Sequence, residues 1–362
     1  MWLIKDWNCK KVIEEKISFE PKDNTYLLGC EDAEGMFLEA WKNNSLHQSW
    51  LISGIKGIGK ATFAYRIARF LLSDDNEKKA DLSSLDISPN SNTFRQIAKG
   101  SHPEFKLIER GYIEKDRKKI LKSIKDGNYM SDEELASLKK SSVISVDDVR
   151  TINDFLSKKS ADGKWRVVLI DTVDEMNSSS ANAILKILEE PPHKSIILLI
   201  SHNPAVLLPT IKSRCVKLNL APLKENQVIS LLRRYKSELS EEVIKKIAAI
   251  SGGSIGKAIA YADSNALEMF EDIYSLATSG KNFKTEEMLK FCDSVVEDEE
   301  SYSLFKELVL KFLAEQARAS NKVEDTTDMY EKAIKTFKET ESLNLDKRQA
   351  IMTIMVAICR VY

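Results

Sequence analysis

The sequence predicts an α/β fold built on a parallel sheet, followed by an all-helical region. Three continuous apolar segments have the composition of strands buried on both faces of such a sheet, namely 50–53, 167–170 and 196–200. Helical spacing of apolar residues separates these strands, as in a βαβ architecture. From Asn226 to the last residue nearly every segment has helical periodicity. Residues 105–108 are a further strand candidate.

The helices between the strands have clear boundary signals. The first follows a glycine-rich run and extends over 60–72. Ser145 is a favourable N-cap for a helix that runs to about residue 160. A helix over 178–190 is ended by Pro191 and Pro192, and another is expected over 204–212.

Two segments interrupt this pattern. Residues 73–101 are polar and have no clear period. Residues 110–142 are dense in Lys, Asp and Glu, which is typical of a solvated surface loop or a frayed helix. After Pro222 the alternation of strands and helices gives way to helical periodicity alone. This change predicts three domains: an α/β domain over 1–221, a small helical domain over 222–275 and a helical bundle over 276–362.

Composition excludes several classes of protein. The 54 Lys and Arg residues balance 55 Asp and Glu residues, so a generally basic nucleic-acid-coating protein is excluded, although a local patch such as the lysines of 115–125 is not. No apolar run approaches 18 residues, and no secretory signal is visible, so no membrane association is expected. Five scattered cysteines without a CxxC pair indicate reduced thiols and a cytoplasmic protein without a metal site.

The glycine-rich run is the most specific motif. Gly54, Gly57, Gly59 and Lys60 fit a phosphate-binding loop between a strand and a helix, where backbone N–H groups hold phosphates and the lysine reaches the β and γ oxygens. The next residue is Ala61, whereas a Ser or Thr hydroxyl holds Mg²⁺ in a working loop. The motif therefore favours a true phosphate-binding loop at which ATP or ADP binds weakly if at all and without efficient hydrolysis; the alternative is a glycine turn with no ligand.

Other polar residues follow the predicted strands. Asp171 ends the 167–170 strand, where it could face a metal ion, and Glu175 could polarise a water molecule. His202 follows the 196–200 strand, at a place that can sense a γ-phosphate, but a turn residue explains it equally well. Arg214, after the 204–212 helix, is a candidate arginine finger, against the simpler reading of a surface charge.

These motifs together resemble the clamp-loader branch of the AAA+ proteins, and its delta-prime-type members most closely. The resemblance rests on the loop at 54–62, on Ser-His-Pro-Glu-Phe from Ser101, on the run 181–192 that ends Leu-Glu-Glu-Pro-Pro, and on the Ser213-Arg-Cys triplet. The resemblance covers about residues 50–260. The C-terminal part matches the family only in its size and its helical periodicity.

The resemblance implies a RecA-like P-loop domain, a small helical lid and an all-helical collar that joins subunits into a ring. It implies partner subunits of the gamma/tau and delta types, and a sliding clamp and primed DNA reached through the complex. It also implies that Arg214 serves a neighbour's ATP, since delta-prime-type subunits are generally not the motors. Lys257 stands near the expected sensor arginine of the lid, and it lacks the fork of a guanidinium.

This sequence departs from the family's pattern in one respect, and two alternative functions are open. Many family members carry a four-cysteine zinc module after the loop helix, but 73–105 contains no cysteine, so no zinc is expected there. One alternative is an active gamma/tau-like motor of the same fold, against which Ala61 argues. The other is an unrelated P-loop ATPase, against which the Ser213-Arg-Cys triplet and the helical tail argue.

Overall fold

The computed structural model describes residues 18–361 apart from 80, 129, 132–133, 136, 159–163, 281–282 and 320–322. Its chain divides into two compact units, one made of 1–237 with 253–256 and the other of 238–252 with 257–362. Cys9, one of the five cysteines, lies outside the described residues. The three-domain division remains a prediction.

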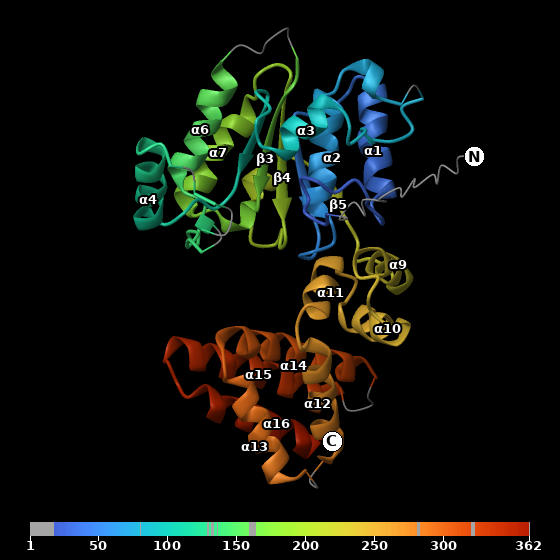
Figure 1. Cartoon of the computed structure of the whole chain (residues 1–362), viewed down its shortest axis with the longest axis vertical. Coiled ribbons are helices and arrows are strands. Elements are labelled where there is room, and N and C mark those ends of the chain that lie inside the picture. The colour runs from blue at the N-terminus through green and yellow to red at the C-terminus, as the bar shows by residue number, and fades with distance from the viewer. Residues whose placement is uncertain are drawn as a thin grey trace, which may run out of the picture. The chain divides into compact units, whose positions relative to one another are not determined.

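A five-stranded parallel sheet forms the centre of the first unit (Figure 1). Its strands, in the order β2-β3-β4-β1-β5, are β1 (Ser49–Ser53), β2 (Phe105–Ile108), β3 (Arg166–Asp171), β4 (Ser195–Ser201) and β5 (Val216–Asn219). The sequence predicted the first four but not β5, whose residues alternate in burial because it is an edge strand. All carboxyl ends of the strands lie along one edge of the sheet, and all amino ends lie along the opposite edge.

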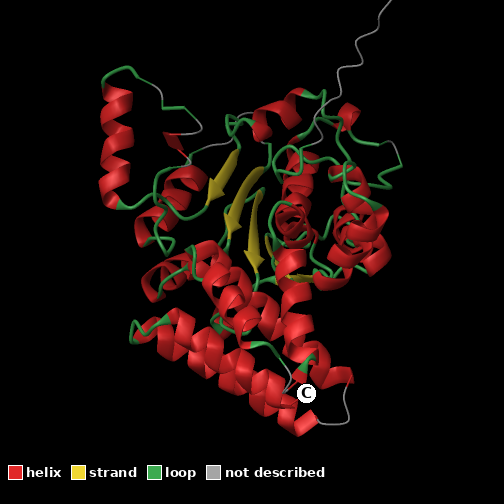
Figure 2. Cartoon of the chain, turned by 60° about the horizontal axis from the view of Figure 1, so that its bottom comes forward, coloured by secondary structure: helices red, strands yellow, loops and turns green. Residues whose placement is uncertain are grey.

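Helices cover both faces of the sheet (Figures 1 and 2). One apolar cluster joins the sheet to α1 (Glu31–Lys42), α2 (Lys60–Leu72) and α3 (Asn92–Ala98). A second cluster joins the other face to α6 (Val146–Ser157), α7 (Ser178–Glu189) and α8 (Pro209–Lys212). The first unit also contains the short 3-10 turns η1 (Asp75–Glu77) and η3 (Val173–Glu175) and the helix α9 (Glu225–Tyr235).

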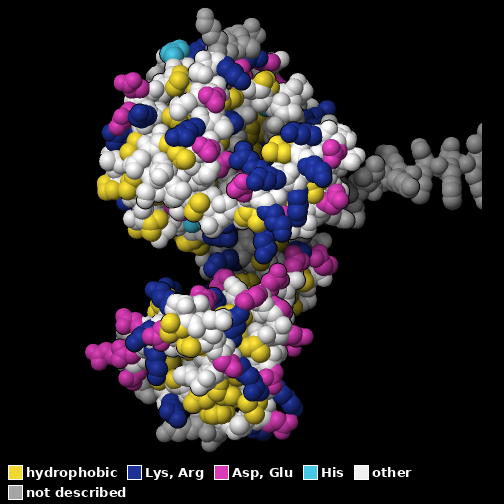
Figure 3. All heavy atoms as spheres, turned by 90° about the vertical axis from the view of Figure 1, so that its left-hand side faces the viewer, with side chains coloured by type: hydrophobic (Ala, Val, Ile, Leu, Met, Phe, Trp, Pro, Cys, Tyr) yellow, Lys and Arg dark blue, Asp and Glu magenta, His cyan; other side chains and the backbone are white. Residues whose placement is uncertain are grey.

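Helix α4 (Glu114–Lys125) lies in the charged segment, where the sequence left a surface loop or a frayed helix open. The buried carboxylate of Asp116 accepts a hydrogen bond from the backbone N–H of Lys139 at 3.0 Å, and the N–H of Ile113 donates to the Lys139 carbonyl at 3.0 Å. These bonds hold the start of the helix to the chain segment that returns from it toward the sheet. The side of the α/β unit that carries α4 faces the viewer in Figure 3, and Lys and Arg side chains gather on it.

One helix was not expected from the sequence, and another begins later than expected. Helix α3 lies within the polar segment that showed no period; Ser91 caps it by accepting the N–H of Phe94 at 3.0 Å. The helix expected over 204–212 begins only at Pro209, because the residue before a proline is driven to extended backbone and Leu208 has ψ 134°.

The second unit is all-helical. Its helices are α10 (Glu241–Ile250), α11 (Ile255–Ala262, whose first two residues belong to the first unit), α12 (Ala266–Thr278), α13 (Thr285–Val295), α14 (Glu299–Ala319), α15 (Val323–Ser342) and α16 (Lys347–Val361). Phe305 of α14 is fully buried between Phe291 of α13 and Phe337 of α15, with ring centroids 5.8 and 6.1 Å away. Among the described helices of either unit, none is long and apolar enough to cross a membrane.

Candidate functional site

The glycine loop lies where the sequence predicts it, between β1 and α2 at the carboxyl edge of the sheet. Gly57 and Gly59 have φ angles of 83° and 100°, a region that side-chain-bearing residues rarely adopt. A Cβ on Gly57 would also lie 2.4 Å from Ser254 Oγ. Both the backbone conformation and the close approach therefore require glycine at this position.

Lys60 is buried in this loop, with 3% of the residue exposed. Its Nζ donates hydrogen bonds of 2.7 Å to the carbonyl oxygens of Gly54 and Ile55, both in the loop itself. Burial lowers the pKa of Lys60 to about 8, against the opposing attraction of Asp171 and Asp174. The ammonium group that would bind a phosphate is thus held by the loop's own backbone.

The segment 253–256, which belongs to the first unit, packs against the same loop. Ser254 Oγ donates to the Lys56 carbonyl at 2.8 Å, and the Gly256 N–H donates to the Gly57 carbonyl at 2.8 Å. Lys257, the next residue, belongs to the second unit, where its Nζ forms an ion pair with Glu307 at 2.6 Å. A role for Lys257 at a nucleotide remains a prediction.

Asp171 ends β3 at the same edge of the sheet as the loop. Burial raises the pKa of its carboxyl group, and the Thr172 hydroxyl, which donates to it at 3.0 Å, opposes that shift. Glu175 pairs with Arg110 at 2.9 Å. The expectation that Glu175 polarises a water beside Asp171 therefore has no support in this arrangement.

Asp174 is a polar residue of this region that the sequence analysis missed. Its carboxylate accepts hydrogen bonds from Ser201 Oγ at 2.6 Å and from the backbone N–H groups of His202 and Asn203. It thereby joins the end of β3 to the end of β4. The signal available in the sequence was a second carboxylate three residues after Asp171.

His202 lies beside these groups with a half-buried ring. Burial, together with the charge of Lys60, lowers its pKa to about 4, although Asp174 acts in the opposite direction. Its Nε2 lies 3.3 Å from the Thr172 hydroxyl. The imidazole is therefore neutral at physiological pH and can act as a hydrogen-bonding group but not as a cation.

The loop fits a phosphate better than it fits a metal-bound nucleotide. The glycine backbone and Lys60 are the groups that hold phosphates. Ala61 offers no hydroxyl for Mg²⁺, and Thr62 is 5% exposed within α2. In the described part of the chain, no group of three or more His, Cys, Asp or Glu side chains could hold a metal ion.

Arg214 lies at the other edge of the sheet. It comes two residues before Val216, which pairs with Trp50 near the amino end of β1, whereas the glycine loop follows the carboxyl end of β1. At about 3.3 Å per residue, the five residues of β1 separate the two edges by about 16 Å. The candidate finger and Lys60 therefore lie on opposite sides of this unit.

The guanidinium group of Arg214 is already engaged. It donates to the Thr210 carbonyl at 2.9 Å and to the carboxylate of Glu189, the last residue of α7, at 2.5 Å. The side chain remains 32% exposed. Glu189 is thus a second polar residue at this edge, and the sequence analysis gave it no role.

Comparison with known proteins settles the family. The family described as "DNA polymerase III, delta subunit" matches residues 30–224, which are more than half of the chain and include all five strands of the sheet. This chain belongs to that family. DNA polymerase III subunit delta' of Pseudomonas aeruginosa is 31% identical over 207 residues, which are 57% of this chain and 53% of that protein.

Other DNA polymerase III subunits are also similar to this chain. Subunit delta' of Escherichia coli K12 is 25% identical over 59% of this chain and 54% of that protein. Subunit tau/gamma of Haemophilus influenzae is 27% identical over 71% of this chain and 35% of that protein. The aligned parts thus span only a third to about half of these relatives. Both subunit types match, so identity alone does not separate delta' from gamma.

Proposed function

We propose that this chain is a delta-prime-like subunit of a DNA polymerase III clamp loader that supplies Arg214 to the ATP of a neighbouring subunit. Two features of its own loop support a role other than that of a motor. Ala61 lacks the hydroxyl that holds Mg²⁺, and Lys60 is bonded to the carbonyl oxygens of Gly54 and Ile55. ATP or ADP would bind at Gly54, Gly57, Gly59 and Lys60 without efficient hydrolysis.

The separation between Arg214 and Lys60 is the observation that carries this proposal. In phosphoryl transfer, negative charge spreads over the γ-phosphate oxygens, and a guanidinium group placed there speeds the reaction by roughly 10³–10⁵ in GTPases. Arg214 lies at the amino edge of the sheet, while the chain's own phosphate loop lies at the carboxyl edge. An arginine that cannot reach its own nucleotide is available to another subunit's nucleotide.

Assembly is assigned to the helical region over 276–362, the proposed collar. Two large apolar side chains, Leu343 and Leu345, are 66% and 51% exposed where α15 leads to α16. A partner helix would cover them. The names of these relatives, which are DNA polymerase III subunits, support partners within such a complex, and the proposal takes these partners to be of the gamma/tau and delta types. The clamp and primed DNA would be reached through the assembled, cytoplasmic complex.

A gamma/tau-like motor is the second candidate, favoured by the similarity to tau/gamma of Haemophilus influenzae. Reconstitution separates the two candidates. Complexes that contain Arg214→Ala should assemble but hydrolyse ATP about 10-fold or more slowly in the presence of clamp and primed DNA, while the isolated wild-type chain turns over no ATP. Turnover by the isolated chain that is lost in Lys60→Ala would favour the motor.

A further inference from the structure

We propose that Glu189 is a positioning residue for Arg214: its carboxylate holds the guanidinium in the orientation in which a neighbouring subunit's nucleotide meets it. This inference rests on the proposed function of Arg214. The observation that prompts it is the 2.5 Å ion pair between Glu189 Oε1 and the Arg214 Nη2 atom. An exposed arginine without fixed acceptors would sample many rotamers.

The two acceptors of Arg214 approach it from different elements. Glu189 is the last residue of α7, and Thr210, whose carbonyl accepts from Nη1 at 2.9 Å, lies in α8. Two separate anchors fix both the position and the rotation of a planar guanidinium group, which a single acceptor does not. Arg214 is thus ordered before any partner arrives.

The anchors themselves are rigid because both elements pack into one apolar core. Leu188, the neighbour of Glu189, is 4% exposed, and Ile211, the neighbour of Thr210, is 1% exposed. Both side chains belong to the cluster that covers the second face of the sheet. A functional side chain is positioned best when its supporting groups are themselves held by packing.

The ion pair leaves Arg214 able to bind a second anion. A guanidinium group has five N–H donors, and the contacts with Glu189 and Thr210 each use one. The remaining donors include Nε–H and one on each terminal nitrogen. Since the side chain is 32% exposed, a phosphate brought by another subunit could reach them without displacing Glu189.

Glu190 provides a matched control. It is the same residue type, one position further along, exposed, and without a contact to Arg214. The test measures clamp- and DNA-stimulated ATP hydrolysis by the reconstituted complex with Glu189→Ala, Glu189→Gln, Glu189→Asp or Glu190→Ala. We expect Glu189→Ala to lower kcat about 10-fold at unchanged KM, because misplaced catalytic groups lose rate rather than affinity. Glu189→Gln should be intermediate, Glu189→Asp should recover part of the rate, and Glu190→Ala should match wild type.

A double-variant comparison separates this inference from the function on which it rests. In the Arg214→Ala background, Glu189→Ala should cause no further loss, because there is no guanidinium left to position. If Arg214→Ala itself has no effect, the proposed function fails. If Arg214→Ala slows hydrolysis but Glu189→Ala matches Glu190→Ala, the positioning role alone is wrong. A faster rate in Glu189→Ala would mean that the pair withholds the arginine, which would also overturn the proposal.

Discussion

Lys60 Nζ lies 2.7 Å from the carbonyl oxygen of Gly54, inside the loop whose lysine is expected to bind phosphate. The burial of this ammonium group has an energetic consequence, because burial disfavours its charged form. The pKa of Lys60 is about 8 in the folded chain and ordinarily near 10.5. Between these two values the unfolded chain holds a proton that the folded chain has released.

This difference predicts a pH effect on stability. Stability rises with pH wherever the unfolded state binds more protons, so Lys60 should favour folding increasingly from about pH 8 to pH 10.5. Cys30 and Cys215, with pKa values raised by burial to about 12, act in the opposite direction at high pH. The measurement is therefore the difference in unfolding free energy between wild type and Lys60→Met. That difference should grow across the window, and a constant difference would contradict the assigned protonation.

Restoring the missing hydroxyl should restore metal-dependent binding but not turnover. Ala61→Thr supplies a Mg²⁺ ligand at the start of α2, so ATP should bind more tightly with Mg²⁺ than without it. Hydrolysis should stay absent, because Glu175 is paired with Arg110 and is not available to polarise a water. Calorimetry with and without Mg²⁺ measures the first effect and phosphate release the second. Rapid hydrolysis by Ala61→Thr would show that the hydroxyl was the only missing part.

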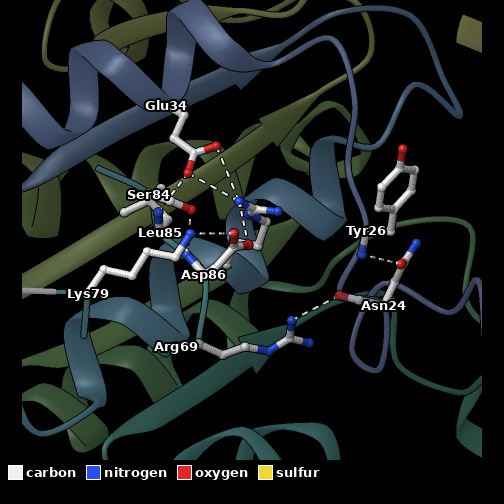
Figure 4. A network of polar contacts seen from close by, with 9 residues as sticks. Asn24, Tyr26, Glu34, Arg69, Lys79, Ser84, Leu85 and Asp86 are labelled. Carbon is white, nitrogen blue, oxygen red and sulfur yellow. Dashed lines mark hydrogen bonds and ion pairs between the residues drawn. The ribbon is translucent and has the colours of Figure 1, made fainter. Parts of the chain in front are cut away.

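The polar network around Glu34 should be a stability determinant of the α/β unit (Figure 4). The Glu34 carboxylate accepts the Leu85 N–H at 2.6 Å and pairs with Arg66 at 3.1 Å, and Arg66 also pairs with Asp86 at 2.8 Å. These bonds fasten the cysteine-free segment after α2 to α1 and α2. Glu34→Ala removes one acceptor from the buried guanidinium of Arg66 and the acceptor of the buried Leu85 N–H. We therefore expect it to lower the free energy of unfolding by about 2–4 kcal/mol.

Glu39→Ala is the control for that variant, because Glu39 is exposed on the same helix. It should change the unfolding free energy by less than about 0.5 kcal/mol, as surface substitutions usually do. Denaturant unfolding of both variants measures the contrast. Equal losses would mean that the network contributes nothing specific.

The proposed collar predicts a loss of assembly without a loss of folding. Leu343→Ser combined with Leu345→Ser removes exposed apolar surface and should leave the fold intact while weakening co-purification with partner subunits. Leu121→Ser combined with Ile124→Ser on α4 is the control, since those side chains are 51% and 56% exposed in the other unit. Equal behaviour of the two double variants in a pull-down would argue against the collar assignment.

Much of the α/β layer could be predicted from the sequence, and the exceptions have physical reasons. The strands at 50–53, 167–170 and 196–200 are fully buried, so hydrophobicity alone revealed them. β5 lies at the edge of the sheet and α3 is short, so neither has a strong periodic signal. α4 has an outer face dominated by lysines, and its single deeply buried side chain, Asp116, is polar.

The residues of the candidate site also divide into those that the sequence predicted and those that it did not. The loop glycines and Lys60 have a characteristic local spacing, and the structure places them together. Asp174 and Glu189 act through partners 27 and 25 residues away along the chain, and no local pattern signals such pairs. Their roles become visible only when the sheet brings the strand ends together.

The central claim is that this chain activates another subunit's ATP and not its own. The most direct measurement compares Lys60→Ala and Arg214→Ala, each placed only in this chain of an otherwise wild-type loader, under clamp- and DNA-stimulated ATP hydrolysis. We expect the loader with Lys60→Ala to hydrolyse ATP at the wild-type rate and the loader with Arg214→Ala to be about 10-fold or more slower. A loss of hydrolysis with Lys60→Ala together with a wild-type rate for Arg214→Ala would contradict it.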